Sequence, residues 1–291
     1  MDQISSASFQ VMGKCSQAIL FGNKADWNSA IKSTLDDELY SAEFGKLNDT
    51  DISPFDCIVP LTLADYRDLD AHQDFAGIKF LNPSGDLVKL CNDKLSLNRF
   101  LLQTEYRDFI PRLYEPGDAP FPYIIKRRED QWGMNSYLVR NPQEEQDHAN
   151  LIGDPGFFLQ TYVSGTQEYA THILAVDGRI IFGTTIISET ASDFYVRGAR
   201  SSPNSFCLSR EPRWVDAFAG VISRIGYTGT CCIDYKITNG LPRIFEINPR
   251  FGWSLHMDIN EYLHAYLNAL RSRATADPFH SERCLVQPGV K

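Results

Sequence analysis

The sequence predicts a mixed α+β and α/β protein, in which a small domain with a parallel sheet precedes a larger domain built on antiparallel hairpins. Two observations support this prediction. Short apolar segments alternate with helical segments through residues 1–88, which is typical of a parallel sheet. Further along the chain, stretches of alternating apolar and polar residues flank the turns Asp177-Gly178 and Asn239-Gly240, which predicts β-hairpins.

Composition describes an ordinary globular protein. The 291 residues are 43% apolar and 22% charged, enough for a sizeable core and for two or three lobes. A net charge of -9 argues against a nucleic-acid or anionic-membrane partner, and no apolar run approaches a membrane span or a signal-peptide core. Seven cysteines, an odd number without C-x-x-C, fit a reducing compartment, so we expect a cytoplasmic protein.

The first 88 residues read as a small α/β lobe. Helices are expected from Ala25 and over residues 61–69, and no Gly-x-Gly-x-x-Gly follows a strand, so a dinucleotide site is not expected. Residues 82–85, Asn-Pro-Ser-Gly, mark a plausible boundary. Three apolar segments are expected as strands: residues 18–21, 55–60 and 77–81.

The stretch from Thr230 to Ser254 predicts a hairpin with one apolar and one polar face. A two-residue turn at Asn239-Gly240 would send Asp234 and Glu246 to opposite faces. A three-residue loop, with Gly240 left-handed, would put both on one face as diagonal neighbours. The apolar faces agree only in the second register, so the three-residue loop is expected.

In that register Asp234, Glu246 and Asn248 converge. Two carboxylates and an amide oxygen are hard ligands that suit Mg²⁺ or Mn²⁺, with water and phosphate oxygens completing the coordination. Arg250 would grip a phosphate or a carboxylate. From these residues alone, an exposed acidic edge of the hairpin is an equally good interpretation.

The pattern Asp234, then Glu246-x-Asn248-Pro249-Arg250, resembles the metal-binding signature of the ATP-grasp superfamily, of the carboxylate–amine ligase type that includes D-alanine–D-alanine ligase and carbamoyl phosphate synthase. The resemblance implies two subdomains that clasp ATP, with two Mg²⁺ ions held by these residues. It also implies a division of the chain into residues 1–88, an ATP-grasp domain over 89–275 (89–156 and 157–275), and a tail over 276–291.

Two lysines upstream fit the same resemblance. Lys94 opens a helix that Asn92 or Asp93 would cap, and Lys126 ends the apolar strand 121–126. In the family, lysines at such positions contact the phosphates, and Lys126 together with Arg250 would absorb charge during phosphoryl transfer. Without the resemblance, Lys94 would be read as a surface lysine.

The loop over residues 127–136 departs from the family pattern. ATP-grasp proteins usually close a glycine-rich lid over the triphosphate, whereas Gly133 is the only glycine here. We expect Arg127 or Arg128, together with Ser136, to hold phosphate in place of backbone N–H groups. An inert connecting loop is the competing interpretation.

Residues 157–163 resemble the family's hinge strand, whose backbone pairs with adenine. On that match Gln160, Thr161, Tyr162 and Val163 line the base, and Glu168 accepts hydrogen bonds from the ribose. Segment 188–209, with Arg197 and Arg200, reads either as a substrate loop or as a long connection. Further helices are expected over residues 212–225 and 255–270.

The resemblance implies an ATP-dependent ligase that activates a carboxylate as an acyl phosphate and joins it to an amine. Small-molecule carboxylate and amine substrates, ATP and Mg²⁺ are expected, and a homodimer is left open. The alternatives are a nucleotide-binding regulatory protein with impaired catalysis, or a carboxylase or phosphotransferase that uses the same ATP site. No convincing Ser-His-Asp or Cys-His set is present, which agrees with chemistry that needs no protein nucleophile.

Overall fold

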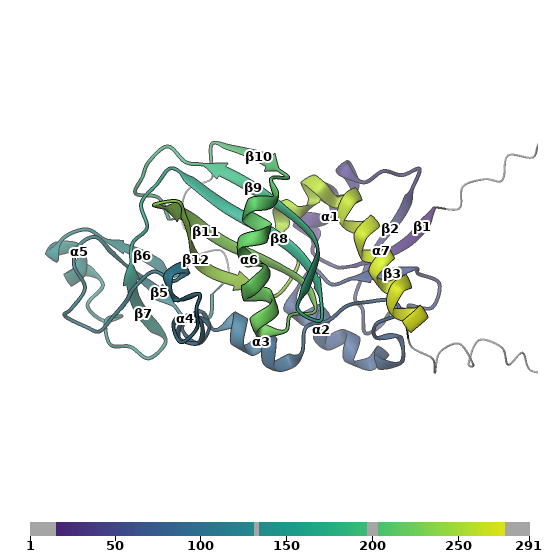
Figure 1. The fold of residues 1–291 in the computed structure, drawn as a ribbon, viewed down its shortest axis with the longest axis horizontal. Coiled ribbons are helices and arrows are strands. Elements are labelled where there is room, and N and C mark those ends of the chain that lie inside the picture. Colours follow the sequence, from purple (N-terminus) through teal and green to yellow (C-terminus); the bar gives the residue numbers. More distant parts are fainter. Residues whose placement is uncertain (1–15, 131–133, 197–202, 277–291) are drawn as a thin grey trace, which may run out of the picture.

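The computed structural model describes residues 16–130, 134–196 and 203–276 (Figure 1). Its first sheet is parallel, as expected, with strand order β2-β1-β3. Residues 77–81 were expected as a strand but contribute only an isolated bridge between Ala76 and Phe80. The elements of this part are β1 (Gln17–Gly22), α1 (Ala25–Thr34), β2 (Tyr40–Gly45), β3 (Cys57–Val59), α2 (Leu63–Asp68) and η1 (Leu69–Phe75).

The last helix of the described chain packs on this first sheet. It is α7 (Ile259–Ala276), preceded by η3 (Trp253–Asp258), and Figure 1 shows it beside β1 and β3. Tyr262 and Tyr266 are fully buried in one core with residues of β1, and the Tyr266 hydroxyl accepts a hydrogen bond from the Leu81 amide at 2.7 Å. The two ends of the described chain therefore share a core, and the predicted boundary near residue 88 stays a prediction.

The middle of the chain forms a four-stranded antiparallel sheet of order β4-β7-β5-β6. Asp93 caps α4, since its carboxylate accepts from the amides of Leu95 and Ser96. The elements are α3 (Gly85–Asn92), α4 (Lys94–Leu102), η2 (Arg107–Phe109), β4 (Leu113–Tyr114), β5 (Tyr123–Arg127), β6 (Ser136–Val139), α5 (Pro142–Asp147) and β7 (Phe157–Thr161).

A five-stranded antiparallel sheet of order β10-β9-β8-β11-β12 follows. Helix α6 packs on one of its faces, where Phe218, Val221 and Ile222 are fully buried. The elements are β8 (Gln167–Val176), β9 (Arg179–Glu189), β10 (Ser205–Ser209), α6 (Pro212–Ile225), β11 (Gly229–Thr238) and β12 (Leu241–Asn248). Both expected hairpins and the helix over 212–225 are confirmed. Within the described ranges, none of the helices has the length and apolar character that crossing a membrane requires.

The β11–β12 hairpin corrects the expected turn. Thr238 pairs with Leu241, so the loop is the two-residue Asn239-Gly240, and both of its residues have positive φ. The three-residue loop was therefore wrong. A β-bulge at Phe245 inserts one extra residue in β12 and restores the register that the loop was expected to provide.

Candidate functional site

A cavity lies between the two antiparallel sheets. Side chains alternate between the faces of a strand, so the even-numbered residues of β8 and β11 share one face, and their odd-numbered neighbours pack against α6 in the core. The four-stranded sheet closes the other side. The polar cavity residues include Lys94, Lys126, Ser136, Gln160, Glu168, His172, Asp234, Lys236, Glu246, Asn248 and Arg250. Sequence reasoning had singled out all of these except His172 and Lys236.

Two carboxylates and an amide meet at one end of the cavity. Asp234 lies directly opposite Glu246 in the sheet, and Asn248 Nδ2 donates to Asp234 Oδ2 at 2.9 Å and to Glu246 Oε1 at 2.8 Å. Among the described residues, no group of three or more His, Cys, Asp or Glu is arranged to hold a metal ion. The set here differs, because its third member is an amide. If the Asn248 side chain rotated to present its oxygen, two carboxylates and one amide oxygen would fit a hard divalent cation.

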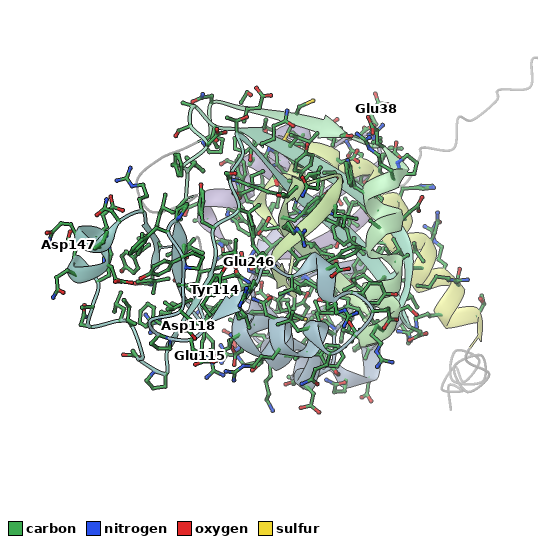
Figure 2. The ribbon with its side chains drawn as sticks, turned by 60° about the vertical axis from the view of Figure 1, so that its left-hand side comes forward. Glu38, Tyr114, Glu115, Asp118, Asp147 and Glu246 are labelled. Carbon is green, nitrogen blue, oxygen red and sulfur yellow. The ribbon has the colours of Figure 1, made fainter. Side chains whose placement is uncertain are left out.

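Two buried lysines lie around Glu246. Lys94 Nζ lies 3.1 Å from Glu246 Oε2 and donates to the Asp130 carbonyl at 2.8 Å. Lys126 Nζ donates to the carbonyl of the bulge residue Phe245 at 3.2 Å. Lys94 is 5% exposed and Lys126 6% exposed, so both charges are held away from bulk water. In Figure 2 Glu246 lies in the interior of the molecule, between Asp147 at the left-hand end and Glu38 at the upper right.

Burial and neighbouring charges set the protonation of this cluster. Burial opposes ionisation of Glu246, but the ammonium groups of Lys94 and Lys126 outweigh it and lower the pKa of that carboxyl. Burial also lowers the pKa of Lys126 to about 8; Lys94 adds to this shift, while Glu246, Glu168 and Asp234 oppose it. Lys126 is thus a lysine whose charge is sensitive to mildly alkaline pH.

The predicted hinge lies at the other end of the cavity. β7 ends at Thr161, and residues 162–165 continue outside any strand. Gln160 Nε2 donates to the Pro111 carbonyl at 3.2 Å, so this amide is used within the protein. The Tyr162 hydroxyl donates to the Asp193 carbonyl at 2.6 Å and accepts from the Tyr195 amide at 2.8 Å, which fastens segment 190–196 beside the hinge. Val163 and Glu168 line the cavity next to it.

Aromatic and basic groups lie beside the carboxylates at the same end of the cavity. Arg250 donates to the Phe251 carbonyl at 3.0 Å and to Asn248 Oδ1 at 3.3 Å, and its guanidinium carbon lies 6.0 Å from the Trp27 ring centroid. Trp27 belongs to α1, so the first part of the chain contributes to this cavity. His172 Nε2 and Ser254 Oγ lie 2.9 Å apart in the same wall.

A family model described as an ATP-grasp domain matches residues 91–254, more than half of the 291-residue chain. The chain belongs to the ATP-grasp family. A search of curated protein sequences gives no significant match.

Solved structures show the same ATP-grasp fold. D-Alanine–D-alanine ligase from Bacillus anthracis complexed with ATP is 13% identical with a TM-score of 0.54, covering 90% of this chain and 100% of that chain. Phosphoribosylamine–glycine ligase from Thermotoga maritima is 14% identical with a TM-score of 0.62, covering 88% and 75%. L-Amino acid ligase from Bacillus licheniformis is 14% identical with a TM-score of 0.54, covering 88% and 74%. The predicted ATP-grasp fold is confirmed.

The expected lid is only partly assembled around the ATP-grasp cavity. Arg128 does not reach it, because its guanidinium pairs with both carboxylate oxygens of Asp93. Ser136 lines the cavity, whereas Arg127 lines a separate groove. Residues 131–133 of the loop lie outside the described residues, as do Arg197 and Arg200 of the expected substrate loop. A phosphate-holding role for Arg127 stays a prediction.

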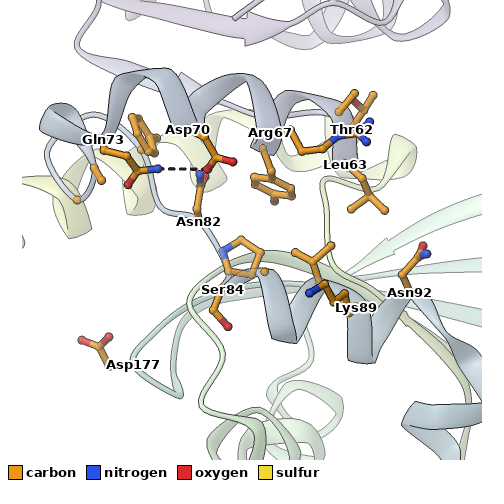
Figure 3. Close-up of a pocket in the computed structure, with 18 of the residues that line it drawn as sticks. Thr62, Leu63, Arg67, Asp70, Gln73, Asn82, Ser84, Lys89, Asn92 and Asp177 are labelled. Carbon is orange, nitrogen blue, oxygen red and sulfur yellow. Dashed lines mark hydrogen bonds between the residues drawn. The ribbon is translucent and has the colours of Figure 1, made fainter. Parts of the chain in front are cut away.

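The separate groove lies away from the ATP-grasp signature residues. Figure 3 shows it between the α2–η1 segment, with Thr62, Arg67 and Asp70, and helix α3, with Ser84 and Lys89. Apart from Arg127, none of the predicted site residues lines it. The groove mixes acidic and basic side chains without a cluster that indicates a ligand, so the cavity between the antiparallel sheets is the candidate active site.

Lys236 is the main residue of the ATP-grasp cavity that sequence reasoning missed. It follows Asp234 by two positions, on the same polar face of β11, so the alternation that singled out Asp234 also pointed to Lys236. His172 was missed because one histidine in an apolar strand reads as a core residue. Its place in the site becomes clear only when β8 pairs with β11, which sets His172 beside Cys232.

Proposed function

We propose that this ATP-grasp protein is a ligase that uses ATP to activate a carboxylate as an acyl phosphate and then joins it to an amine. One observation carries the proposal. Asp234, Glu246 and Asn248 share one cavity with the buried ammonium groups of Lys94 and Lys126. Facing sets of oxygen ligands and fixed cations are what a metal-bound triphosphate requires.

In the proposed complex, ATP lies along the cavity with its base at the hinge and its phosphates at the carboxylates. Residues 160–163 line the base and Glu168 accepts from the ribose. Asp234, Glu246 and Asn248 would hold Mg²⁺, with two ions expected and Mn²⁺ as a substitute. The metal would neutralise the triphosphate and align its γ-phosphoryl group.

Lys94, Lys126 and Arg250 would stabilise the remaining negative charge of the phosphates. Lys94 is paired with Glu246 and the Asp130 carbonyl, and Lys126 with the Phe245 carbonyl. With a metal held by Glu246, Lys94 would lose its carboxylate partner, and both ammonium groups would donate to phosphate oxygens. Arg250 donates to Asn248 and to the Phe251 carbonyl, and it would stabilise the charge that accumulates on the transferred group.

The reaction proceeds in two displacements. A carboxylate oxygen of the substrate attacks the γ-phosphorus, the bond to the β,γ-bridging oxygen breaks, and ADP leaves. The amine nitrogen then attacks the acyl carbon, phosphate leaves, and the nitrogen loses a proton to form the amide. The end lined by Trp27, Arg250 and Ser254 is where we place the small carboxylate and amine substrates. A cytoplasmic setting is part of this proposal.

Product analysis tests the proposal. The purified protein is incubated with ATP, Mg²⁺ and a panel of amino acids and small carboxylates, with hydroxylamine as a surrogate amine. We expect ADP and phosphate release that depends on one class of acid, together with a hydroxamate of matching mass. Glu246→Gln serves as the inactive control.

Other products would contradict the ligase. Release of AMP and pyrophosphate would exclude an acyl phosphate. A stable phosphorylated acid without hydroxamate would indicate a phosphotransferase, and incorporation of bicarbonate into the acceptor would indicate a carboxylase. Tight ATP binding without turnover on any acid would favour the regulatory alternative.

A further inference from the structure

Lys236 is a buried ammonium group without a hydrogen-bond partner in the described structure. Its side chain is 2% exposed and lines the ATP-grasp cavity, and no partner for its Nζ is found among the described residues. Lys94 and Lys126, the other lysines of the cavity, both donate to backbone carbonyls. Lys236 therefore differs from them in having its donors unused.

The surroundings of Lys236 belong to the hinge end of the cavity. Its Nζ lies 5.6 Å from the Tyr162 ring centroid, and its Cδ is 4.0 Å from the position that a Cβ on Gly165 would occupy. Continuing the β8–β11 register beyond Tyr235–Tyr169 places Lys236 beside Glu168. These neighbours follow the hinge strand, whereas Lys94 and Lys126 surround Glu246.

The acids around Lys236 agree with this placement. Glu168 and Asp193 are the acids that attract its ammonium group, whereas Asp234 and Glu246, together with Glu168, attract that of Lys126. Two of the three acids around Lys126 are the proposed metal ligands, and neither of them is among the acids around Lys236.

An ammonium group in this position needs an acceptor. It carries three donors and no acceptor, and burying it without a partner costs free energy that a bound acceptor atom would recover. Glu168 and Asp193 are the nearest acids, but Lys236 Nζ makes no hydrogen bond to either of them in the described structure. A molecule bound in the cavity would supply an acceptor.

We propose that Lys236 donates from Nζ to an acceptor atom on the nucleoside half of the bound nucleotide, and so determines nucleotide affinity and selectivity from the base end. This inference rests on the proposed ATP site. The acceptor is a ring nitrogen of the base or an oxygen of the ribose. The two sources share the same chemistry, and the test separates them.

The test compares the wild-type protein with Lys236→Met, which keeps the length of the side chain and removes its donors. Affinities for ATP, adenosine, adenine and inorganic tripolyphosphate are measured with Mg²⁺ by competition against a fluorescent ADP. We expect Lys236→Met to weaken ATP and adenosine by the same factor, about 10- to 100-fold, because one charge-assisted hydrogen bond is lost. Tripolyphosphate should be unaffected. The affinity for adenine should fall by the same factor in Lys236→Met if the acceptor is on the base, and should not change if the acceptor is on the ribose.

A second readout separates ligand recognition from a structural role. Removal of an unpartnered buried charge should leave the melting temperature of the ligand-free protein unchanged or raise it. Lys89→Met, at a lysine whose side chain is 82% exposed, controls for the loss of one positive charge. The inference is overturned if adenosine affinity is unchanged in Lys236→Met, if tripolyphosphate weakens equally, or if the melting temperature falls. Wild-type protein that binds no ATP would instead overturn the proposed function.

Discussion

Asp234 lies directly opposite Glu246 in the β11–β12 hairpin, although a two-residue turn closes that hairpin. The bulge at Phe245 makes this arrangement possible. Without it, Glu246 and Asn248 would turn toward the core face that α6 covers. The bulge also directs the Phe245 carbonyl to Lys126 Nζ, so one irregularity places both the carboxylates and a phosphate-binding lysine.

Asn248 should contribute both to the stability of the metal-free protein and to the binding of Mg·ADP. Asn248→Ala removes the donor shared by Asp234 and Glu246 and leaves their charges facing each other. We expect the free energy of unfolding to fall by about 1–3 kcal/mol without metal, and Mg²⁺-dependent ADP binding to weaken at least about tenfold. Thermal unfolding and calorimetry measure the two effects.

Asn248→Asp is the matched variant for this prediction. It adds a third carboxylate, so the metal-free protein should again be less stable, but Mg²⁺ should now raise its melting temperature more than that of the wild type. Wild-type ADP binding by Asn248→Ala would show that the amide is not part of the site.

The ammonium group of Lys126 should make nucleotide binding depend on pH. Burial, together with Lys94, lowers its pKa to about 8 in the nucleotide-free protein, while Glu246, Glu168 and Asp234 oppose the shift. Below pH 8 the group is already charged. Above pH 8 it must take up a proton before it binds phosphate, so the affinity for Mg·ADP should fall by up to about tenfold per pH unit.

The control for this pH dependence is Lys126→Met. It should bind weakly at every pH and lose the decline above pH 8, because the titrating group is gone. Calorimetry between about pH 7 and pH 9.5 gives both profiles. A wild-type affinity that is equal at the two ends of this range would contradict the assignment of Lys126 to phosphate.

Arg128 should matter for folding and not for nucleotide binding. Its side chain, 35% exposed, holds the Asp93 carboxylate that caps α4. Because solvent screens this pair, Arg128→Ala should lower the free energy of unfolding by about 1 kcal/mol and change ATP affinity by less than about twofold. A large rise in the ATP dissociation constant with unchanged stability would instead indicate that Arg128 holds phosphate, as a lid residue would.

Much of the site could be predicted because alternation in a strand is visible in sequence. Asp234 and Lys236 share a parity, and so do Glu246 and Asn248, which is enough to put each pair on one face. The bulge could not be predicted, since Phe245 is apolar and fits an alternating pattern as well as Ile247 does. A three-residue turn and a bulge both add one residue to the hairpin, so sequence could not distinguish them.

The helices and strands that bury one face could be predicted, because such a face leaves a periodic pattern of apolar residues in the sequence. Elements without such a face were missed or wrongly predicted. β2 (Tyr40–Gly45) was missed because it lies at the edge of the first sheet and only Tyr40 is fully buried. Residues 77–81 looked like a strand because Ile78, Phe80 and Leu81 are apolar. In the structure the Lys79 amide donates to the Phe75 carbonyl, and Gly77, with positive φ, closes a turn. The Arg128–Asp93 pair depends on tertiary contact between two elements, which no local pattern encodes.

The most direct test of this account is the metal dependence of ATP binding. ATP is titrated calorimetrically into wild-type protein and into Asp234→Asn/Glu246→Gln, each with Mg²⁺ and with excess EDTA. We predict that the wild type binds ATP much more tightly with Mg²⁺ than with EDTA, and that the double variant binds equally weakly in both. Wild-type affinity that is the same with and without Mg²⁺, or a double variant that keeps the metal dependence, would contradict a Mg·ATP site at these carboxylates.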